Sequence, residues 1–89
     1  MLVEKIRNDM TIAQNEKNRL DAEVLSIILE TLSNAAAAKG SALTEDDERV
    51  VLAKDRRMAL KFEGKGSAIQ KEFGDFMHRR VELLDRYLK

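Results

Sequence analysis

The single histidine of the sequence, His78, stands three residues after Asp75 and four residues before Glu82. On a helix these spacings bring both carboxylates close to the imidazole, and the trio has residue types that bind metal ions or exchange protons. Zinc sites, however, usually draw on several histidine or cysteine ligands, and this sequence has one histidine and no cysteine. We therefore interpret the trio as an exposed charge network and assign neither a catalytic residue nor a metal ligand.

Two other short segments contain groups that could hold magnesium or phosphate. The run Glu45-Asp46-Asp47-Glu48 points its carboxylates in successive directions around a helix, whereas magnesium sites need carboxylates that converge. We interpret this run as a charged helix start in water. Gly64-Lys65-Gly66-Ser67 is similar to the end of a phosphate-binding P-loop, but the first glycine of that motif is missing and no strand precedes it. A turn between helices is the favoured interpretation, and we predict no cofactor.

The main concentration of basic residues lies between Arg49 and Lys65, where Lys54, Arg57 and Lys61 share one helix face by their spacing of three and four. RNA is the partner that such a face would bind through its phosphates. No aromatic residues for base stacking are interleaved with these three, and 16 basic and 16 acidic residues leave the chain without net charge. A solvated face is therefore favoured, and these three are retained as candidate RNA-binding residues.

Composition predicts one small helical domain over residues 1–89. Apolar residues make up 44% of the chain and charged residues 36%, with no proline, a mixture typical of helical bundles. The absence of cysteine fits a reducing compartment, so we predict a cytoplasmic protein. Charged residues interrupt the apolar ones at the N-terminus, so no signal peptide or membrane span is expected. Hydrolase, transferase and dinucleotide-binding motifs are lacking, and we expect the protein not to be an enzyme.

Apolar residues at steps of three and four predict two helices in the first half of the chain. The first covers residues 2–16 and has the apolar stripe Leu2, Ile6, Met10 and Ala13. A polar turn follows, and Asp21 is the predicted cap of a second helix, which is the most hydrophobic and should form the centre of the core. This helix is expected to end at Gly40, because glycine readily adopts the left-handed conformation.

Two further helices are predicted in the second half. Thr44, followed by the acidic run, indicates the start of a third helix that extends to about Phe62. Its apolar residues are sparse and mixed with basic ones, so we expect it to lie on the surface; among them are Val50, Val51, Met58 and Phe62. The fourth helix, capped by Ser67, has the stripe Ile69, Phe73, Phe76, Arg80, Leu83 and Tyr87. The predicted fold class is all-α, a small bundle of about four helices.

The order of these segments resembles the N-terminal helical domain of the YqeY-like proteins, a family named together with the B subunit of the tRNA-dependent amidotransferase. The residues that carry the resemblance are Ile6 to Met10 with Ala13, Leu20 to Ala35, Gly40 with Leu43 to Glu48, Val51 to Lys54, and Glu82 to Leu88. The resemblance implies a four-helix, non-enzymatic domain. Family members continue after this point into a second helical domain linked to tRNA binding, which this chain is expected to lack.

Two functions are left open by the sequence. The leading hypothesis is a binding module that docks a protein partner or associates with itself through the last helix, at Ile69, Phe73 and Phe76. Four short helices with wide apolar stripes have more apolar surface than one small core covers, and a partner would bury the remainder. The alternative is an accessory RNA-binding or tRNA-binding protein that uses Lys54, Arg57 and Lys61.

Overall fold

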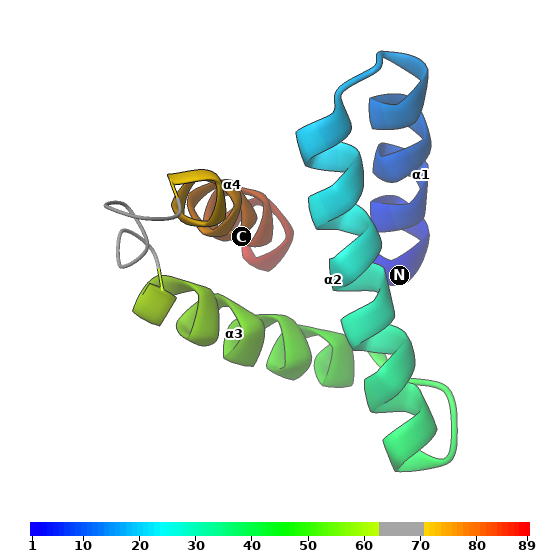
Figure 1. Cartoon of the computed structure of the whole chain (residues 1–89). Coiled ribbons are helices and arrows are strands. Elements are labelled where there is room, and N and C mark those ends of the chain that lie inside the picture. The colour runs from blue at the N-terminus through cyan, green and yellow to red at the C-terminus, as the bar shows by residue number, and fades with distance from the viewer. Residues whose placement is uncertain (63–70) are drawn as a thin grey trace.

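The computed structural model describes residues 1–62 and 71–89, and these residues form four α-helices (Figure 1). The helices are α1 (Leu2–Asn15), α2 (Arg19–Lys39), α3 (Glu45–Phe62) and α4 (Lys71–Leu88). The predicted all-α bundle is therefore confirmed, with the boundaries of the first three helices within about three residues of those expected. None of the described helices is long and apolar enough to cross a membrane. The predicted cap Ser67 and the glycine-containing segment 64–67 lie outside the described residues.

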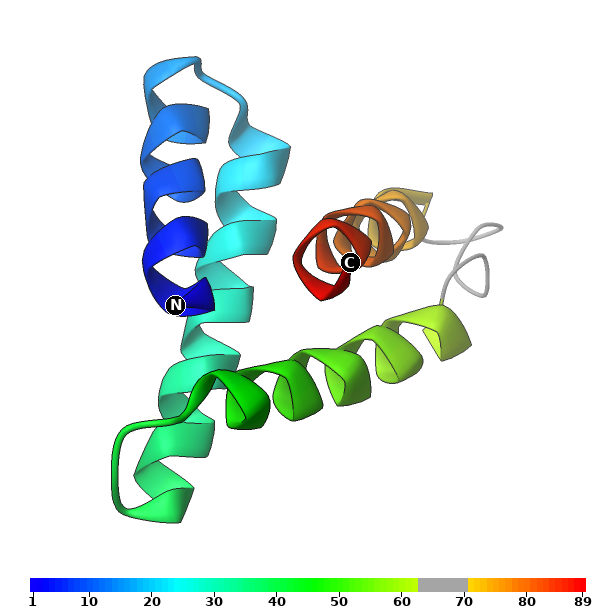
Figure 2. The same cartoon turned by 180° about the vertical axis from the view of Figure 1, so that it is seen from behind.

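The four helices form two packed pairs. α1 and α2 lie side by side and antiparallel, and α3 runs across the C-terminal half of α2 at a steep angle (Figures 1 and 2). α4 packs along α3 and also contacts α2, so it fills the space between the α1–α2 hairpin and α3. Seen from behind, the N-terminal end of α1 lies just above the start of α3 (Figure 2).

The turn between α1 and α2 is capped one turn earlier than the sequence predicted. Lys17 takes a positive φ of 58°, and the side chain of Asn18 accepts a hydrogen bond from the backbone N–H of Asp21 at 3.2 Å. Asn18 is therefore the N-cap, and the expectation that Asp21 caps this helix is wrong. At the other end, Gly40 has a φ of 83° and ends α2 in the left-handed conformation, as predicted.

The start of α3 has the cap that its sequence predicts. The Thr44 hydroxyl accepts a hydrogen bond from the backbone N–H of Asp47 at 3.1 Å, and the Asp47 carboxylate accepts one from the Thr44 N–H at 3.0 Å. Lys39, at the end of α2, donates to the same carboxylate at 2.5 Å. This hydrogen bond, with those from Thr44, lowers the pKa of Asp47 to about 2. The Lys39–Asp47 salt bridge therefore connects the end of α2 to the start of α3.

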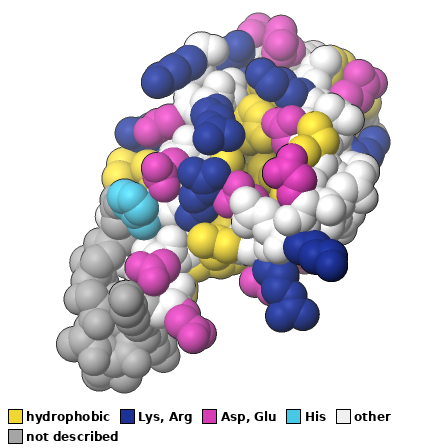
Figure 3. Space-filling view, turned by 90° about the horizontal axis from the view of Figure 1, so that it is seen from above, with side chains coloured by type: hydrophobic (Ala, Val, Ile, Leu, Met, Phe, Trp, Pro, Cys, Tyr) yellow, Lys and Arg dark blue, Asp and Glu magenta, His cyan; other side chains and the backbone are white. Residues whose placement is uncertain are grey.

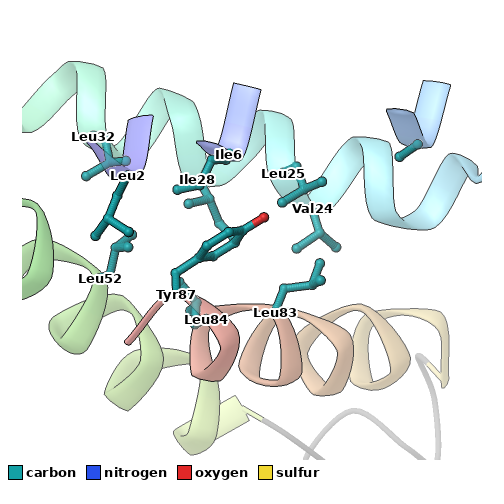
Figure 4. Packing of buried hydrophobic residues seen from close by; sticks show 11 residues of the cluster. Leu2, Ile6, Val24, Leu25, Ile28, Leu32, Leu52, Leu83, Leu84 and Tyr87 are labelled. Atoms are coloured by element: carbon teal, nitrogen blue, oxygen red, sulfur yellow. The ribbon is translucent and has the colours of Figure 1, made fainter. Parts of the chain in front are cut away.

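The main core lies between α2 and α4 and extends to α1 and the start of α3 (Figure 4). Its buried residues are Leu2, Ile6, Ala13, Val24, Leu25, Ile28, Leu32, Leu52, Leu83, Leu84 and Tyr87. Tyr87 crosses the middle of this cluster, and its hydroxyl donates to the carboxylate of Asp9 on α1 at 2.7 Å (Figure 4). A smaller cluster of Ala59, Met77 and Val81 lies between α3 and α4. Phe76 packs against both clusters and joins them.

α3 is not the surface helix that the sequence predicted. Its buried residues recur at steps of four, three and four and are Glu48, Leu52, Asp55 and Ala59. Val50 and Phe62, two of the apolar residues named in the sequence of this helix, are 63% and 41% exposed and do not belong to this buried stripe. The reason is that two of the four buried positions carry carboxylates, which a search for apolar periodicity assigns to solvent.

The buried carboxylate of Glu48 corrects the interpretation of the acidic run as a solvated helix start. Its two oxygens accept hydrogen bonds from the backbone N–H groups of Leu2 at 3.2 Å and Val3 at 3.0 Å. The side chain is fully buried, yet both oxygens have donors from the first turn of α1. A helix N-terminus carries partial positive charge, so the first turns of α1 and α3 both stabilise the negative charge of this carboxylate. Glu48 therefore joins the N-terminal end of α3 to the N-terminal end of α1 through these two hydrogen bonds.

Candidate protein-docking groove

A groove runs between the N-terminal parts of α2 and α4, and it contains two of the three interaction residues that the sequence predicted, Phe73 and Phe76. Its volume is about 680 Å³, and its lining residues are Arg19, Leu20, Glu23, Glu72, Phe73, Asp75 and Phe76. The apolar lining comes from both helices, since Leu20 belongs to α2 and the two phenylalanines belong to α4. The chain therefore brings together two apolar segments that are about 50 residues apart in sequence.

The two predicted phenylalanines have different environments. Phe73 is 36% exposed, and its ring meets that of Phe62 edge to face with centroids 6.1 Å apart. Phe76 is half-buried because it packs against both core clusters. Phe73 is thus the accessible ring of the groove, whereas Phe76 belongs largely to the core. The third predicted residue, Ile69, lies outside the described residues.

The walls of the groove are held by a salt bridge between α2 and α4. Arg79 donates from Nε and Nη2 to the two carboxylate oxygens of Asp21, at 2.7 and 2.8 Å. The hydrogen bonds from Arg79 are the main cause of a pKa of Asp21 below its ordinary value, and the same pair raises the pKa of Arg79. Because Asp21 follows Leu20 and Arg79 lies one turn after Phe76, this bidentate pair fixes the spacing of the groove walls.

The charged residues around the groove are mainly acidic. Glu23, Glu72 and Asp75 are exposed, and Arg19 is the basic residue of the lining. Among the described lining residues, three carboxylates and one guanidinium give a net charge of −2, although the whole chain has a net charge of zero. Acidic and basic side chains alternate across the face seen in Figure 3, with hydrophobic side chains between them.

The predicted basic residues of α3 form a separate surface. Lys54, Arg57 and Lys61 are exposed, and their spacing places them opposite the buried stripe of this helix. None of these three side chains makes an ion pair or hydrogen bond with another residue in the described part of the chain. Arg56, on another side of the helix, is paired with Asp85 of α4.

Several described groups with the capacity for acid–base chemistry are exposed or already paired. His78 is exposed, and its Nε2 lies 3.6 Å from a carboxylate oxygen of Glu82, as the predicted charge network implies. Among residues 1–62 and 71–89, no group of three His, Cys, Asp or Glu side chains could hold a metal ion. A polar hollow of about 220 Å³ beside Tyr87 contains Asp9, Asp21 and Arg86. There Asp9 accepts from the Tyr87 hydroxyl, and burial raises the pKa of Tyr87.

A second apolar hollow lies at the other end of the α1–α2 hairpin. It has a volume of about 590 Å³ and is lined by residues of α1, α2 and the α2–α3 connection, including Val3, Leu29, Ala36 and Leu43. Its charged lining residues are Glu4, Arg7, Glu30 and Glu48, and the last of these is already hydrogen-bonded to the start of α1. The lining of this hollow has no aromatic residue, so we regard the groove at Phe73 as the better candidate.

The α2 wall of the groove was missed in the sequence. Leu20 follows a run of polar residues, and its 40% exposure places it outside the buried stripe of α2. The sequence does contain a signal for a second apolar face of this helix, because Leu20 and Ile27 are seven positions apart and thus lie on one helix face. No family model, curated protein or solved structure matches the chain.

Proposed function

We propose that this protein is a non-enzymatic binding module that docks a partner protein in the groove between α2 and α4. The observation that carries the proposal is the accessible ring of Phe73 in an apolar groove whose walls are joined by the Asp21–Arg79 salt bridge. A preformed groove with an aromatic residue suits a docking site, because aromatic anchors supply much of the binding energy of protein interfaces.

The state of the titratable side chains also supports a binding role over catalysis. Asp21, Asp55 and Asp9 are hydrogen-bonded to Arg79, Arg80 and Tyr87, respectively. These pairs join different helices and therefore stabilise the fold. A catalytic role would require a nucleophile, acid or base directed towards a space that a substrate can enter.

The test compares two serine substitutions, each of which removes one ring of the Phe62–Phe73 pair. Phe73→Ser removes the accessible ring of the groove, whereas Phe62→Ser removes its edge-to-face partner, which does not line the groove. Each tagged variant would be used in a nuclease-treated pull-down, with the captured proteins quantified by mass spectrometry. The proposal expects a specific partner to be lost with Phe73→Ser and kept with Phe62→Ser. Equal recovery of every captured protein by both variants and the original chain would contradict it.

RNA binding is a second candidate function, favoured by the exposed stripe of Lys54, Arg57 and Lys61. Three phosphate contacts to a single strand would give a slope of roughly −2 in a plot of log affinity against log salt concentration. Replacement of all three by alanine should abolish this slope in a fluorescence anisotropy titration with tRNA. Unchanged tRNA binding by the triple variant would exclude this surface.

The kinship with the YqeY-like proteins stays a prediction alongside these two functions. It connects more directly with the second function, because the family is linked to tRNA. The cytoplasmic location and self-association also stay predictions. Sedimentation analysis of the purified protein across a range of concentrations would distinguish self-association from binding to a different protein.

A further inference from the structure

The docking groove continues along α2 beyond its two phenylalanines. A shallow depression next to it is lined by Gln14, Ala22, Glu23, Ser26 and Ile27, and it shares Glu23 with the groove. Leu20 and Ile27 are 40% and 37% exposed. They are seven positions apart, so they lie on one face of α2 at a distance of about 10 Å along its axis. Phe73, Leu20 and Ile27 therefore form an elongated apolar track.

Carboxylates accompany this apolar track over its length. Glu23 lies between Leu20 and Ile27 on the same side of α2, while Glu72 and Asp75 lie next to Phe73 on α4. Asp21 and Arg79, which also join α2 to α4 near the track, are bonded to each other and add no net charge. Arg19 compensates for one of the three carboxylates.

We infer that the partner segment is a basic amphipathic helix. Its apolar residues, spaced by three, four and seven positions, would cover Phe73, Leu20 and Ile27, as helices do in hydrophobic grooves. Lysine or arginine residues beside that apolar stripe would face Glu23, Glu72 and Asp75. An acidic or neutral helix would leave these carboxylates without a counter-charge, so the rim selects among helices of similar hydrophobicity.

This inference rests on the proposed function of the groove, and its test uses two synthetic helical peptides. Both are fluorescein-labelled peptides of about 18 residues with the same leucine stripe, one with lysine and the other with glutamate on its flanks. Their binding to the purified protein is measured by fluorescence anisotropy at about 0.15 M salt, where distant charges are screened. We expect the lysine peptide to bind about tenfold or more tightly than the glutamate peptide.

Charge reversal of the rim provides the decisive comparison. In a variant with Glu23→Lys, Glu72→Lys and Asp75→Lys, the preference should invert in favour of the glutamate peptide. A control with Glu4→Lys, Glu45→Lys and Asp46→Lys makes the same change of charge at exposed positions outside the groove and should keep the original preference. Circular dichroism would verify that both triple variants keep their helices.

The outcomes separate the charge inference from the docking groove itself. If both peptides bind equally well and both lose affinity with Phe73→Ser, the groove docks helices but its rim does not select basic ones. If the lysine peptide binds the Phe73→Ser variant and the original chain alike, the groove is not its site and both proposals fail. A control variant that inverts the preference as fully as the rim variant would also overturn the inference, since general charge would then explain it.

Discussion

The guanidinium of Arg80 on α4 donates two hydrogen bonds to the carboxylate of Asp55 on α3, at 2.9 and 2.7 Å, and both residues are buried. Removal of one partner from such a pair leaves an uncompensated charge in the core, and Arg80→Ala should therefore destabilise the fold by about 3–5 kcal/mol. Urea unfolding followed by circular dichroism measures this change.

A double variant separates the pair from the packing around it. Arg80→Met combined with Asp55→Leu removes both charges and keeps apolar volume, so it should recover most of the stability lost in Arg80→Ala. If Arg80→Ala lowers the free energy of unfolding by less than about 1 kcal/mol, the Asp55–Arg80 pair is exposed to water in solution.

The contact of Glu48 with the start of α1 leads to a second prediction. Glu48→Ala leaves the backbone N–H groups of Leu2 and Val3 without their acceptors, which should cost about 1–3 kcal/mol. Amide hydrogen exchange should accelerate first in the N-terminal turn of α1. Glu48→Gln keeps a side-chain oxygen and should have an intermediate effect. Unchanged exchange in α1 of the alanine variant would contradict the proposed fastening of the two helix ends.

The salt bridge that holds the groove should depend on pH through Asp21. Its folded-state pKa lies below the ordinary value of 3.8, mainly because Arg79 donates to the carboxylate. The resulting stabilisation is fully present above the unfolded-state pKa and is lost as the pH falls through the folded-state pKa. Asp21→Asn should therefore be less stable than the original chain near neutral pH, and this gap should close in acid.

Urea unfolding of the original chain and of Asp21→Asn, from about pH 7 to about pH 2, tests the sign of this pH dependence. Asp47 also has a lowered pKa, of about 2, but it is present in both proteins, so its contribution largely cancels in the comparison. A gap that is constant over this range, or that widens in acid, would contradict the role of Arg79.

Gly40 allows a prediction about the end of α2. Its φ of 83° is unfavourable for other residues, although no atom would contact an added Cβ within 4 Å. Gly40→Ala should thus destabilise the protein by about 1 kcal/mol through backbone strain alone. Ala37→Gly, in the exposed part of the same helix, is the opposite substitution and should also be destabilising. Thermal unfolding that shows Gly40→Ala to be stabilising would contradict the left-handed cap.

Local patterns in the sequence predicted the helices well because their causes are local. The stripe of Leu2, Ile6 and Ala13, the left-handed Gly40 and the cap at Thr44 each depend on residues within a few turns of one another. These signals were sufficient for the fold class and for most helix boundaries.

Two features were not predicted because they depend on contacts between distant segments. These are the buried face of α3 and the position of Leu20 in the wall of the groove. Glu48 has its hydrogen-bond donors 46 residues away at Leu2, and Asp55 has its partner 25 residues away at Arg80. Such charges are indistinguishable from solvated ones until the partner segment is placed. The same holds for Leu20, whose role arises only when α4 brings Phe73 beside it.

The most direct test of the docking groove is site-specific photo-cross-linking. A photoreactive phenylalanine derivative placed at Phe73 retains the aromatic ring in the groove, and the same derivative at Val50 samples an exposed site on α3 outside it. Irradiation in cells should give a discrete, heavier adduct with a partner protein from position 73 and not from position 50. The absence of an adduct at position 73, or the same adducts from both positions, would contradict docking in this groove.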